Sequence, residues 1–176
     1  GINEFELQAV IEGYFVSKAQ LQNALLQNSK RKKTTPEILG FFEAARFAYE
    51  FAFQQFQENE FRITKSSIRA LHALLFSAVD DFPYEKGNFR MGNIIITGAG
   101  FESPDFTRIP ELIDKILWMT HKNKKWTPWR RAAFLHAFFE NLHPLSDGNG
   151  RVGRILSNWV LFAHGFPNIS IKGKEK

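Results

Sequence analysis

The sequence contains no cysteine, which excludes disulfide bonds and any reaction that needs a thiolate as nucleophile or metal ligand. No apolar run approaches the roughly 20 residues that a membrane-spanning helix needs, and no signal-peptide pattern opens the chain. Internal repeats and low-complexity segments are also missing. We therefore expect a cytoplasmic globular protein that has no membrane partner.

The 176 residues are enough for one domain with a sizeable core. A hydrophobic content of 44% is ordinary for a globular chain, and many of the 19 phenylalanines lie at helical spacing. The net charge is +5, with basic side chains gathered in residues 30–33 and at Lys172, Lys174 and Lys176. No aromatic residues are interleaved with these clusters. We interpret them as a solvated loop and tail, and do not expect a nucleic-acid partner.

Residues 143–154, HPLSDGNGRVGR, combine a histidine, a carboxylate, a Gly-Asn-Gly turn and two arginines. Helical apolar runs flank them at 132–142 and 152–163, so the pattern predicts a helix, a tight loop and a second helix. Glycine permits backbone conformations that gather amides, and amides at a helix start attract anions. Arginines add paired donors for phosphate oxygens. The residues therefore predict a polyphosphate site with a base and a metal ligand beside it.

The helix after this loop has two different faces. Its apolar residues recur at helical spacing and form one stripe: Val152, Ile155, Leu156, Trp159, Val160 and Ala163. Arg151, Arg154 and Asn158 lie on another face, which would be presented to the bound anion. Each arginine alone is typical of a solvated helix. Their occurrence together with the glycine turn, Asp147 and His143 favours binding.

The loop resembles the core motif of Fic domains, HxFx(D/E)GNGRxxR. The matching residues are His143, Asp147, Gly148, Asn149, Gly150, Arg151 and Arg154. Leu145 is the one departure, because the family usually has phenylalanine there; leucine keeps an apolar plug under the loop. The resemblance implies an all-α fold, a mainly helical bundle of the Fic type, with one small β-hairpin flap.

The resemblance also implies a protein adenylyltransferase, which moves AMP from ATP to a Ser, Thr or Tyr hydroxyl of a target protein with Mg²⁺ as the metal. His143 would be the general base, because imidazole titrates near neutrality. Asp147 would bind Mg²⁺ as a hard oxygen ligand. The nucleotide would contact the anion hole of Gly148, Asn149 and Gly150, with Arg151 at the β-phosphate, Arg154 at the γ-phosphate and Asn158 near the adenine.

Residues 81–105 interrupt the helical pattern with several turn formers. Residues 93–97 are typical of one arm of a small hairpin, which the Gly-Ala-Gly of 98–100 would end. In the resembled family this position is a flap that pairs with an extended segment of the target protein. Ile94, Ile95 and Ile96 would then accept the target as an added strand. The alternative is a packed connecting hairpin without a partner.

We expect N-terminal helices in residues 1–30 and the catalytic core in 31–176, in one compact domain. Residues 8–13, QAVIEG, resemble the inhibitory helix pattern (S/T)xxxE(G/N) at Glu12 and Gly13, but carry Gln8 in place of Ser or Thr. In the family this glutamate pairs with the second motif arginine, here Arg154, and prevents productive ATP binding. The alternative is that Glu12 is simply exposed at a helix end.

Four further helices are predicted outside the motif. They run from 35 to about 57, from near 64 with a buried stripe of Ile68, Leu71, Leu75, Ala78 and Val79, from 110 to about 121, and from 128 to the motif. His72 and His136 lie within such helices, and we interpret both as structural.

Three other functions fit parts of the sequence. The first is another Fic-type transfer, of a phosphoryl, uridylyl or phosphocholine group. The second is a toxin whose inhibition is built into its own chain. The third is a binding module for protein or nucleic acid that has lost catalysis, although His143 and Asp147 argue against it. A homo-oligomer is compatible with the sequence.

Overall fold

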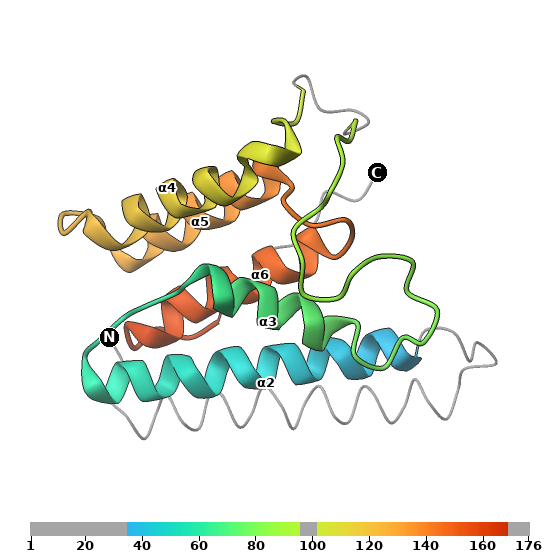
Figure 1. The fold of residues 1–176 in the computed structure, drawn as a ribbon. Coiled ribbons are helices and arrows are strands. Elements are labelled where there is room, and N and C mark those ends of the chain that lie inside the picture. Colours follow the sequence, from blue (N-terminus) through green and yellow to red (C-terminus); the bar gives the residue numbers. More distant parts are fainter. Residues whose placement is uncertain (1–34, 96–101, 169–176) are drawn as a thin grey trace, which may run out of the picture.

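The computed structural model describes residues 35–95 and 102–168. Within them the elements are α2 (Thr35–Glu58), α3 (Lys65–Leu75), the 3-10 turn η1 (Phe106–Arg108), α4 (Ile109–Lys122), α5 (Pro128–Leu142) and α6 (Asn149–Ala163) (Figure 1). The predicted all-α fold is confirmed for this part of the chain. No helix in the described ranges is both long enough and apolar enough to cross a membrane.

The predicted hairpin arm does not appear among the described residues. Residues 93–95 are irregular, and neither they nor any other described residue forms a strand. The remainder of the predicted arm, including Ile96, lies outside the described residues. The same holds for residues 1–34, and so for the helices and the inhibitory segment predicted there.

Helix α3 ends earlier than its sequence pattern predicts. It begins as expected after Thr64, whose hydroxyl accepts from the Ser67 amide while the Ser67 hydroxyl accepts from the Thr64 amide. It ends at Leu75, because Phe76 leaves the helical conformation and its ring stacks on Phe82 with centroids 3.9 Å apart. Ala78 therefore lies beyond the helix and is exposed, so placing it on the buried stripe was wrong.

The connection between α4 and α5 is tied down by one arginine. The Arg131 guanidinium donates to four backbone carbonyls of this connection: Thr120 at 2.9 Å, His121 at 3.2 Å, Asn123 at 2.8 Å and Trp126 at 3.4 Å. The Thr127 hydroxyl caps α5 by accepting from the Arg130 amide. Helices α4 and α5 begin at Ile109 and Pro128, which confirms their predicted starts. The two helices pack side by side (Figure 1).

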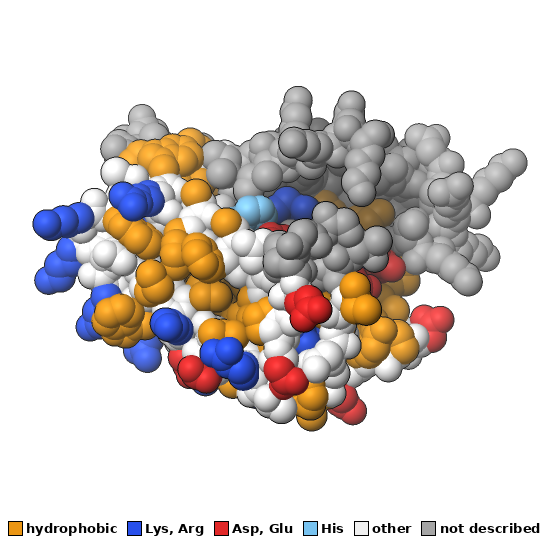
Figure 2. All heavy atoms as spheres, turned by 90° about the horizontal axis from the view of Figure 1, so that it is seen from above, with side chains coloured by type: hydrophobic (Ala, Val, Ile, Leu, Met, Phe, Trp, Pro, Cys, Tyr) orange, Lys and Arg blue, Asp and Glu red, His pale blue; other side chains and the backbone are white. Residues whose placement is uncertain are grey.

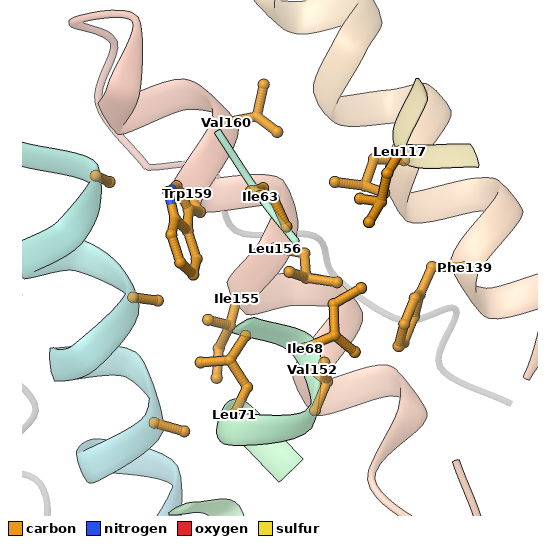
Figure 3. Packing of buried hydrophobic residues seen from close by; sticks show 14 of the residues in the cluster. Ile63, Ile68, Leu71, Leu117, Phe139, Val152, Ile155, Leu156, Trp159 and Val160 are labelled. Carbon is orange, nitrogen blue, oxygen red and sulfur yellow. The ribbon is translucent and has the colours of Figure 1, made fainter. Parts of the chain in front are cut away.

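Helix α6 is the centre of the fold, packed between α2 on one side and α5 on the other (Figure 1). All six residues of its predicted stripe are buried, and Figure 3 shows several of them directed at Ile68 and Leu71 of α3. Burial of each large apolar side chain stabilises the fold by about 1.5–3 kcal/mol. Nearly every residue after Arg154 is buried as well, so the core fixes the position of the helix that follows the motif loop.

Three histidines are wholly or partly buried, and each makes a hydrogen bond through its ring. Burial lowers the pKa of His72, His121 and His164. His72 Nδ1 accepts from the Gly87 amide at 2.9 Å. His121 Nε2 accepts from the Ile63 amide at 3.0 Å, and its Nδ1 donates to the Leu117 carbonyl. Protonation of either accepting nitrogen would break its hydrogen bond. The structural interpretation of His72 therefore agrees with its contacts.

We expect the free energy of unfolding to fall as the pH is lowered from about 7 to about 5. A histidine whose pKa is lower in the folded state stabilises the fold above its unfolded pKa of about 6.5, and this stability is lost as the pH falls through the folded value. The melting temperature measured across this range checks the expectation. The variant His121→Asn, which cannot titrate there, should show a shallower decline. A level melting temperature in the parent chain would contradict the prediction.

Candidate active site

His143 ends helix α5 in an uncommon backbone conformation. Its amide donates to the Phe139 carbonyl at 3.0 Å, but its φ of 49° and ψ of 58° are left-handed. This conformation turns the chain out of α5 and into the loop, and few residues other than glycine adopt it. His143 itself is half-buried. Its ring is therefore not packed away in the core, as a general base requires.

Gly148 sits at the start of α6, where no other residue would fit. Its φ is 80°, and a Cβ there would lie 2.6 Å from Leu75 Cδ2 and 3.1 Å from Phe76 Cε2. No side chain caps this helix start. The Gly148 amide itself donates to Asp147 Oδ1. The amides of the first turn that follows it have no partners within the helix and remain available for an anion.

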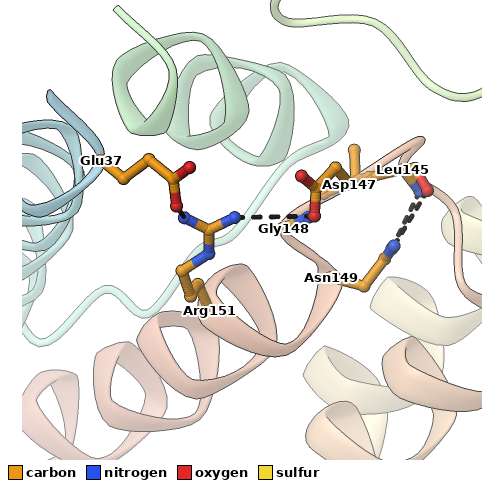
Figure 4. A network of polar contacts seen from close by, with 6 residues as sticks. All are labelled: Glu37, Leu145, Asp147, Gly148, Asn149 and Arg151. Carbon is orange, nitrogen blue, oxygen red and sulfur yellow. Dashed lines mark hydrogen bonds and ion pairs between the residues drawn. The ribbon is translucent and has the colours of Figure 1, made fainter. Parts of the chain in front are cut away.

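The Asn149 side chain holds the loop together. Its Oδ1 accepts from the Leu145 amide and its Nδ2 donates to the Leu145 carbonyl, both at 2.9 Å (Figure 4). Both residues are buried, and Leu145 fills the apolar position that the motif assigns to it. The side chain of Asn149 is thus committed to the loop, which leaves its backbone amide for a ligand.

Arg151 lies between two carboxylates. Its Nη1 is 3.1 Å from Glu37 Oε2 of α2, and its Nη2 is 3.6 Å from Asp147 Oδ1 (Figure 4). The guanidinium also lies over the Phe76 ring, 5.1 Å from its centroid. Asp147 remains largely exposed at the mouth of the loop. The predicted site residues Asp147 and Arg151 are therefore brought together, with Glu37 as an additional partner.

The structure separates Asn158 from the two arginines. Arg154 is exposed, whereas Asn158 is only 7% exposed and donates to the Tyr49 hydroxyl of α2 at 3.1 Å. The expected shared face is interrupted because α2 covers the side of α6 on which Asn158 lies. Its side chain joins two helices, and its contact with the adenine stays a prediction.

Glu140 is a further acidic residue beside the loop that the sequence analysis did not single out. A Cβ on Gly153 would come 2.5 Å from Glu140 Oε1 and 3.4 Å from His136 Nδ1. A Cβ on Gly150 would meet Arg154 Nη1 at 3.4 Å and Glu140 Oε1 at 3.8 Å. The two glycines thus make room for the partly buried Glu140 carboxylate, whose Oε1 is fully covered, close to Arg154. The sequence signal that could have indicated Glu140 is the pair Gly150 and Gly153, whose missing side chains leave space on the side of α6 that faces α5.

A cavity of about 490 Å³ lies next to the motif loop. Residues 83–85 and 89–94 line it, and Ser146 of the loop closes one side. Ile94 is half-buried at this cavity and Ile95 is 95% exposed. The part of the predicted flap that is described thus borders a hollow beside the loop.

The surface also carries an apolar patch. Figure 2 shows hydrophobic side chains gathered on one part of a molecular face, with basic side chains around them.

The two ends of the flap are held together at their base. We use the term flap ends for its described residues, 92–95 and 102–104. Asn93 Nδ2 donates to Asp105 Oδ2 at 3.0 Å, and Asn93 Oδ1 accepts from the Phe106 amide at 2.9 Å. Hydrogen bonds from the Thr107 hydroxyl and from Asn93 lower the pKa of Asp105 to about 2. Asp105 is therefore ionised at neutral pH and acts as a constant acceptor at this base.

The comparisons with known proteins agree with this geometry. The sequence model of the Fic/DOC family matches residues 62–161. A protein of Aquifex aeolicus described as a probable protein adenylyltransferase is 30% identical over 150 residues, which are 84% of this chain and 46% of that protein. Protein adenylyltransferase Fic of Aedes aegypti is 29% identical, over 94% of this chain and 33% of its own length. The chain thus spans less than half of these relatives.

A solved structure shows the same fold. The crystal structure of a Fic domain containing signaling protein from Bacteroides thetaiotaomicron superposes with a TM-score of 0.69 at 27% identity, covering 85% of this chain and 58% of that one. The family match spans more than half of the chain and includes the whole motif loop. This chain belongs to the Fic/DOC family.

Proposed function

We propose that this protein is an adenylyltransferase that transfers AMP from ATP to a hydroxyl of a target protein. One observation carries the proposal: an uncapped helix start, a cationic Arg151 and the half-buried His143 meet in one loop. The distant relatives named as adenylyltransferases support it. A triphosphate fits the helix start because amides and arginine together neutralise its charge.

In the proposed transfer, each bond that breaks is matched by a bond that forms, and the proton has an acceptor. A hydroxyl oxygen of the target attacks the α-phosphorus, and the bond from that phosphorus to the bridging oxygen of pyrophosphate breaks. His143 accepts the hydroxyl proton, a role that contributes about 10²–10⁴-fold in rate. Arg151 and the exposed Arg154 bind the departing β- and γ-phosphates, so that the negative charge of the leaving group is stabilised where it develops.

Mg²⁺ fits the donor set at the loop mouth. Asp147 offers an exposed carboxylate, and Mg²⁺ characteristically binds through one or two carboxylates together with substrate phosphates and water. The described ranges contain no group of three or more His, Cys, Asp or Glu residues that could hold a metal without a substrate. When bound, the ion would neutralise phosphate charge. Asp147 would hold it, and this would draw the carboxylate away from Arg151.

Two further parts of the proposal concern regulation and target binding. Glu12 would inhibit by pairing with Arg154, which is exposed and so open to a carboxylate. The target would lie in an extended conformation along the flap, whose exposed Ile95 offers an apolar contact beside the loop. Glu12 itself lies outside the described residues, so its test is made on activity.

The Glu12→Gly chain, incubated with ATP and Mg²⁺, should gain one or more adenylyl groups on itself, as measured by intact-mass spectrometry. The parent chain should gain fewer, because its γ-phosphate site would be blocked. The matched control Glu60→Gly removes a glutamate that is exposed in the described part of the chain and should behave as the parent does. Equal labelling of all three chains would remove the inhibitory role of Glu12 and leave the transfer reaction standing.

The same measurement separates the alternative reactions. Addition of a phosphoryl group instead of an adenylyl group, or labelling with UTP but not with ATP, would replace adenylyl transfer by another Fic-type reaction. No covalent product with any nucleotide, together with binding to nucleic acid that weakens steeply with salt, would favour the non-catalytic module.

A further inference from the structure

Arg90 is a buried arginine in a segment without regular secondary structure. Its exposed fraction is 2%, and none of the ion pairs among the described residues involves it. Burial lowers the pKa of its guanidinium, and the nearby Asp105 carboxylate opposes this shift. A buried charge without a direct counter-ion is costly unless many hydrogen bonds compensate for it. The N–H donors of the Arg90 guanidinium must therefore find acceptors nearby.

All three guanidinium nitrogens of Arg90 donate. Nε reaches the His143 carbonyl at 2.9 Å, and Nη1 reaches the Gly92 carbonyl at 2.7 Å. Nη2 reaches Ser103 Oγ at 2.9 Å and the Pro104 carbonyl at 2.6 Å. The backbone amide of Arg90 adds a bond to the Pro144 carbonyl at 2.9 Å.

These acceptors belong to two parts of the site. Gly92, Ser103 and Pro104 belong to the flap ends, which Asn93 also bridges through Asp105 and the Phe106 amide. The His143 carbonyl belongs to the left-handed residue that ends α5. That carbonyl lies past the last turn of the helix, so Arg90 satisfies it and holds the residue in its uncommon conformation.

We propose that Arg90 is a positioning residue that holds the flap ends, and with them a bound target, in register with the base His143. The inference rests on the proposed adenylyl transfer and deepens it. A planar fork of donors fixes several acceptors at once, which a single ammonium cannot do. The target hydroxyl must approach His143 within hydrogen-bond distance, and an error of about 1 Å can reduce the rate about 10²-fold. Arg90 thus links the two elements whose separation decides that distance.

The alternative is that Arg90 only stabilises the fold, and Arg131 provides a matched control for it. Arg131 also donates to four backbone carbonyls from a partly buried position, but it does so at the opposite end of α5. A lysine at either position keeps the charge and loses the fork. The two substitutions therefore remove similar contacts at a near and a distant location.

The experiment places Arg90→Lys and Arg131→Lys separately in the Glu12→Gly chain and follows self-adenylylation by intact mass. Arg90→Lys should lower the maximal rate by about tenfold or more, with the ATP concentration for half-maximal rate changed by less than about twofold. This split is expected because the phosphate-binding groups are not bonded to Arg90. Arg131→Lys should keep the maximal rate within about twofold even at an equal loss of melting temperature.

An unchanged maximal rate in Arg90→Lys would overturn the proposal. Equal losses of rate in the two variants at equal losses of stability would overturn it as well, because Arg90 would then be merely structural. Should Arg90→Lys fail to fold, Ser103→Ala serves instead. It removes one acceptor of Arg90 and one bond to the Leu142 carbonyl, and should lower the maximal rate in the same direction by less.

A second measurement separates this proposal from the function on which it rests. If the Glu12→Gly chain transfers no AMP, the adenylyltransferase proposal fails by itself. NMR of the His143 ring and the Ile94 methyl groups then decides on Arg90. Shifts of both signals in Arg90→Lys but not in Arg131→Lys support the link between flap and loop, and unchanged signals in Arg90→Lys overturn it.

Discussion

Replacement of His143 by alanine is expected to abolish AMP transfer. The loss should be at least about 10²-fold, the contribution of a positioned general base. The fold should persist, because His143 is half-buried and these hydrogen bonds involve only its backbone: its amide donates to the Phe139 carbonyl, and its carbonyl accepts from the Arg90 guanidinium. Intact-mass labelling in the Glu12→Gly chain measures the loss.

The left-handed backbone at His143 calls for a second variant. His143→Asn tolerates this conformation better than alanine does, and its amide cannot accept the proton of a hydroxyl at neutral pH. It should therefore match the loss of activity of His143→Ala while retaining more of the parent's melting temperature. Transfer at the parent rate in either variant would show that another group is the base.

The substitution Gly40→Ala is expected to cause the largest loss of stability. A Cβ at this position of α2 would lie 2.0 Å from the Leu75 carbonyl oxygen and 2.6 Å from its carbon. The gain in helix propensity is only about 1 kcal/mol. Overpacking against backbone costs about 1–3 kcal/mol or more, and here α2 must separate from α3. We expect a net loss of about 2 kcal/mol, which lowers the melting temperature by about 4–8 °C at this chain length.

Thermal unfolding followed by circular dichroism measures this effect. Gly92→Ala is the control, because a Cβ there has no atom within 4 Å, and its melting temperature should match that of the parent. A Gly40→Ala chain that is as stable as the parent would show that the two helices are not packed as closely as the structure indicates.

Local patterns in the sequence predicted most of the helices and the motif loop. Capping residues such as Thr64 and Thr127, and the periodic apolar residues of α6, determine structure within a few neighbouring residues. The early end of α3 was missed because it depends on Phe76 stacking on Phe82 beyond the helix. The predicted flap stays a prediction, because part of it lies outside the described residues.

The polar partners of the site could not be predicted, since they come from distant segments. Glu37 reaches Arg151 from α2, and Arg90 reaches His143 from an irregular loop. The burial of Asn158 against α2 could not be predicted either. Helical spacing gives the angle at which a side chain leaves the helix axis, but it does not say that α2 covers that angle.

The burial of α6 on nearly all sides has a consequence for how the proposed transfer can be controlled. A helix enclosed in this way cannot tilt or slide without disrupting the core, so its first turn is a stationary platform. Changes that alter the proposed activity, or that suit it to a different target, would then have to arise in the segments beside that platform. We expect selection for new targets to alter the cavity-lining residues 83–85 and 89–94 more readily than any residue of α6.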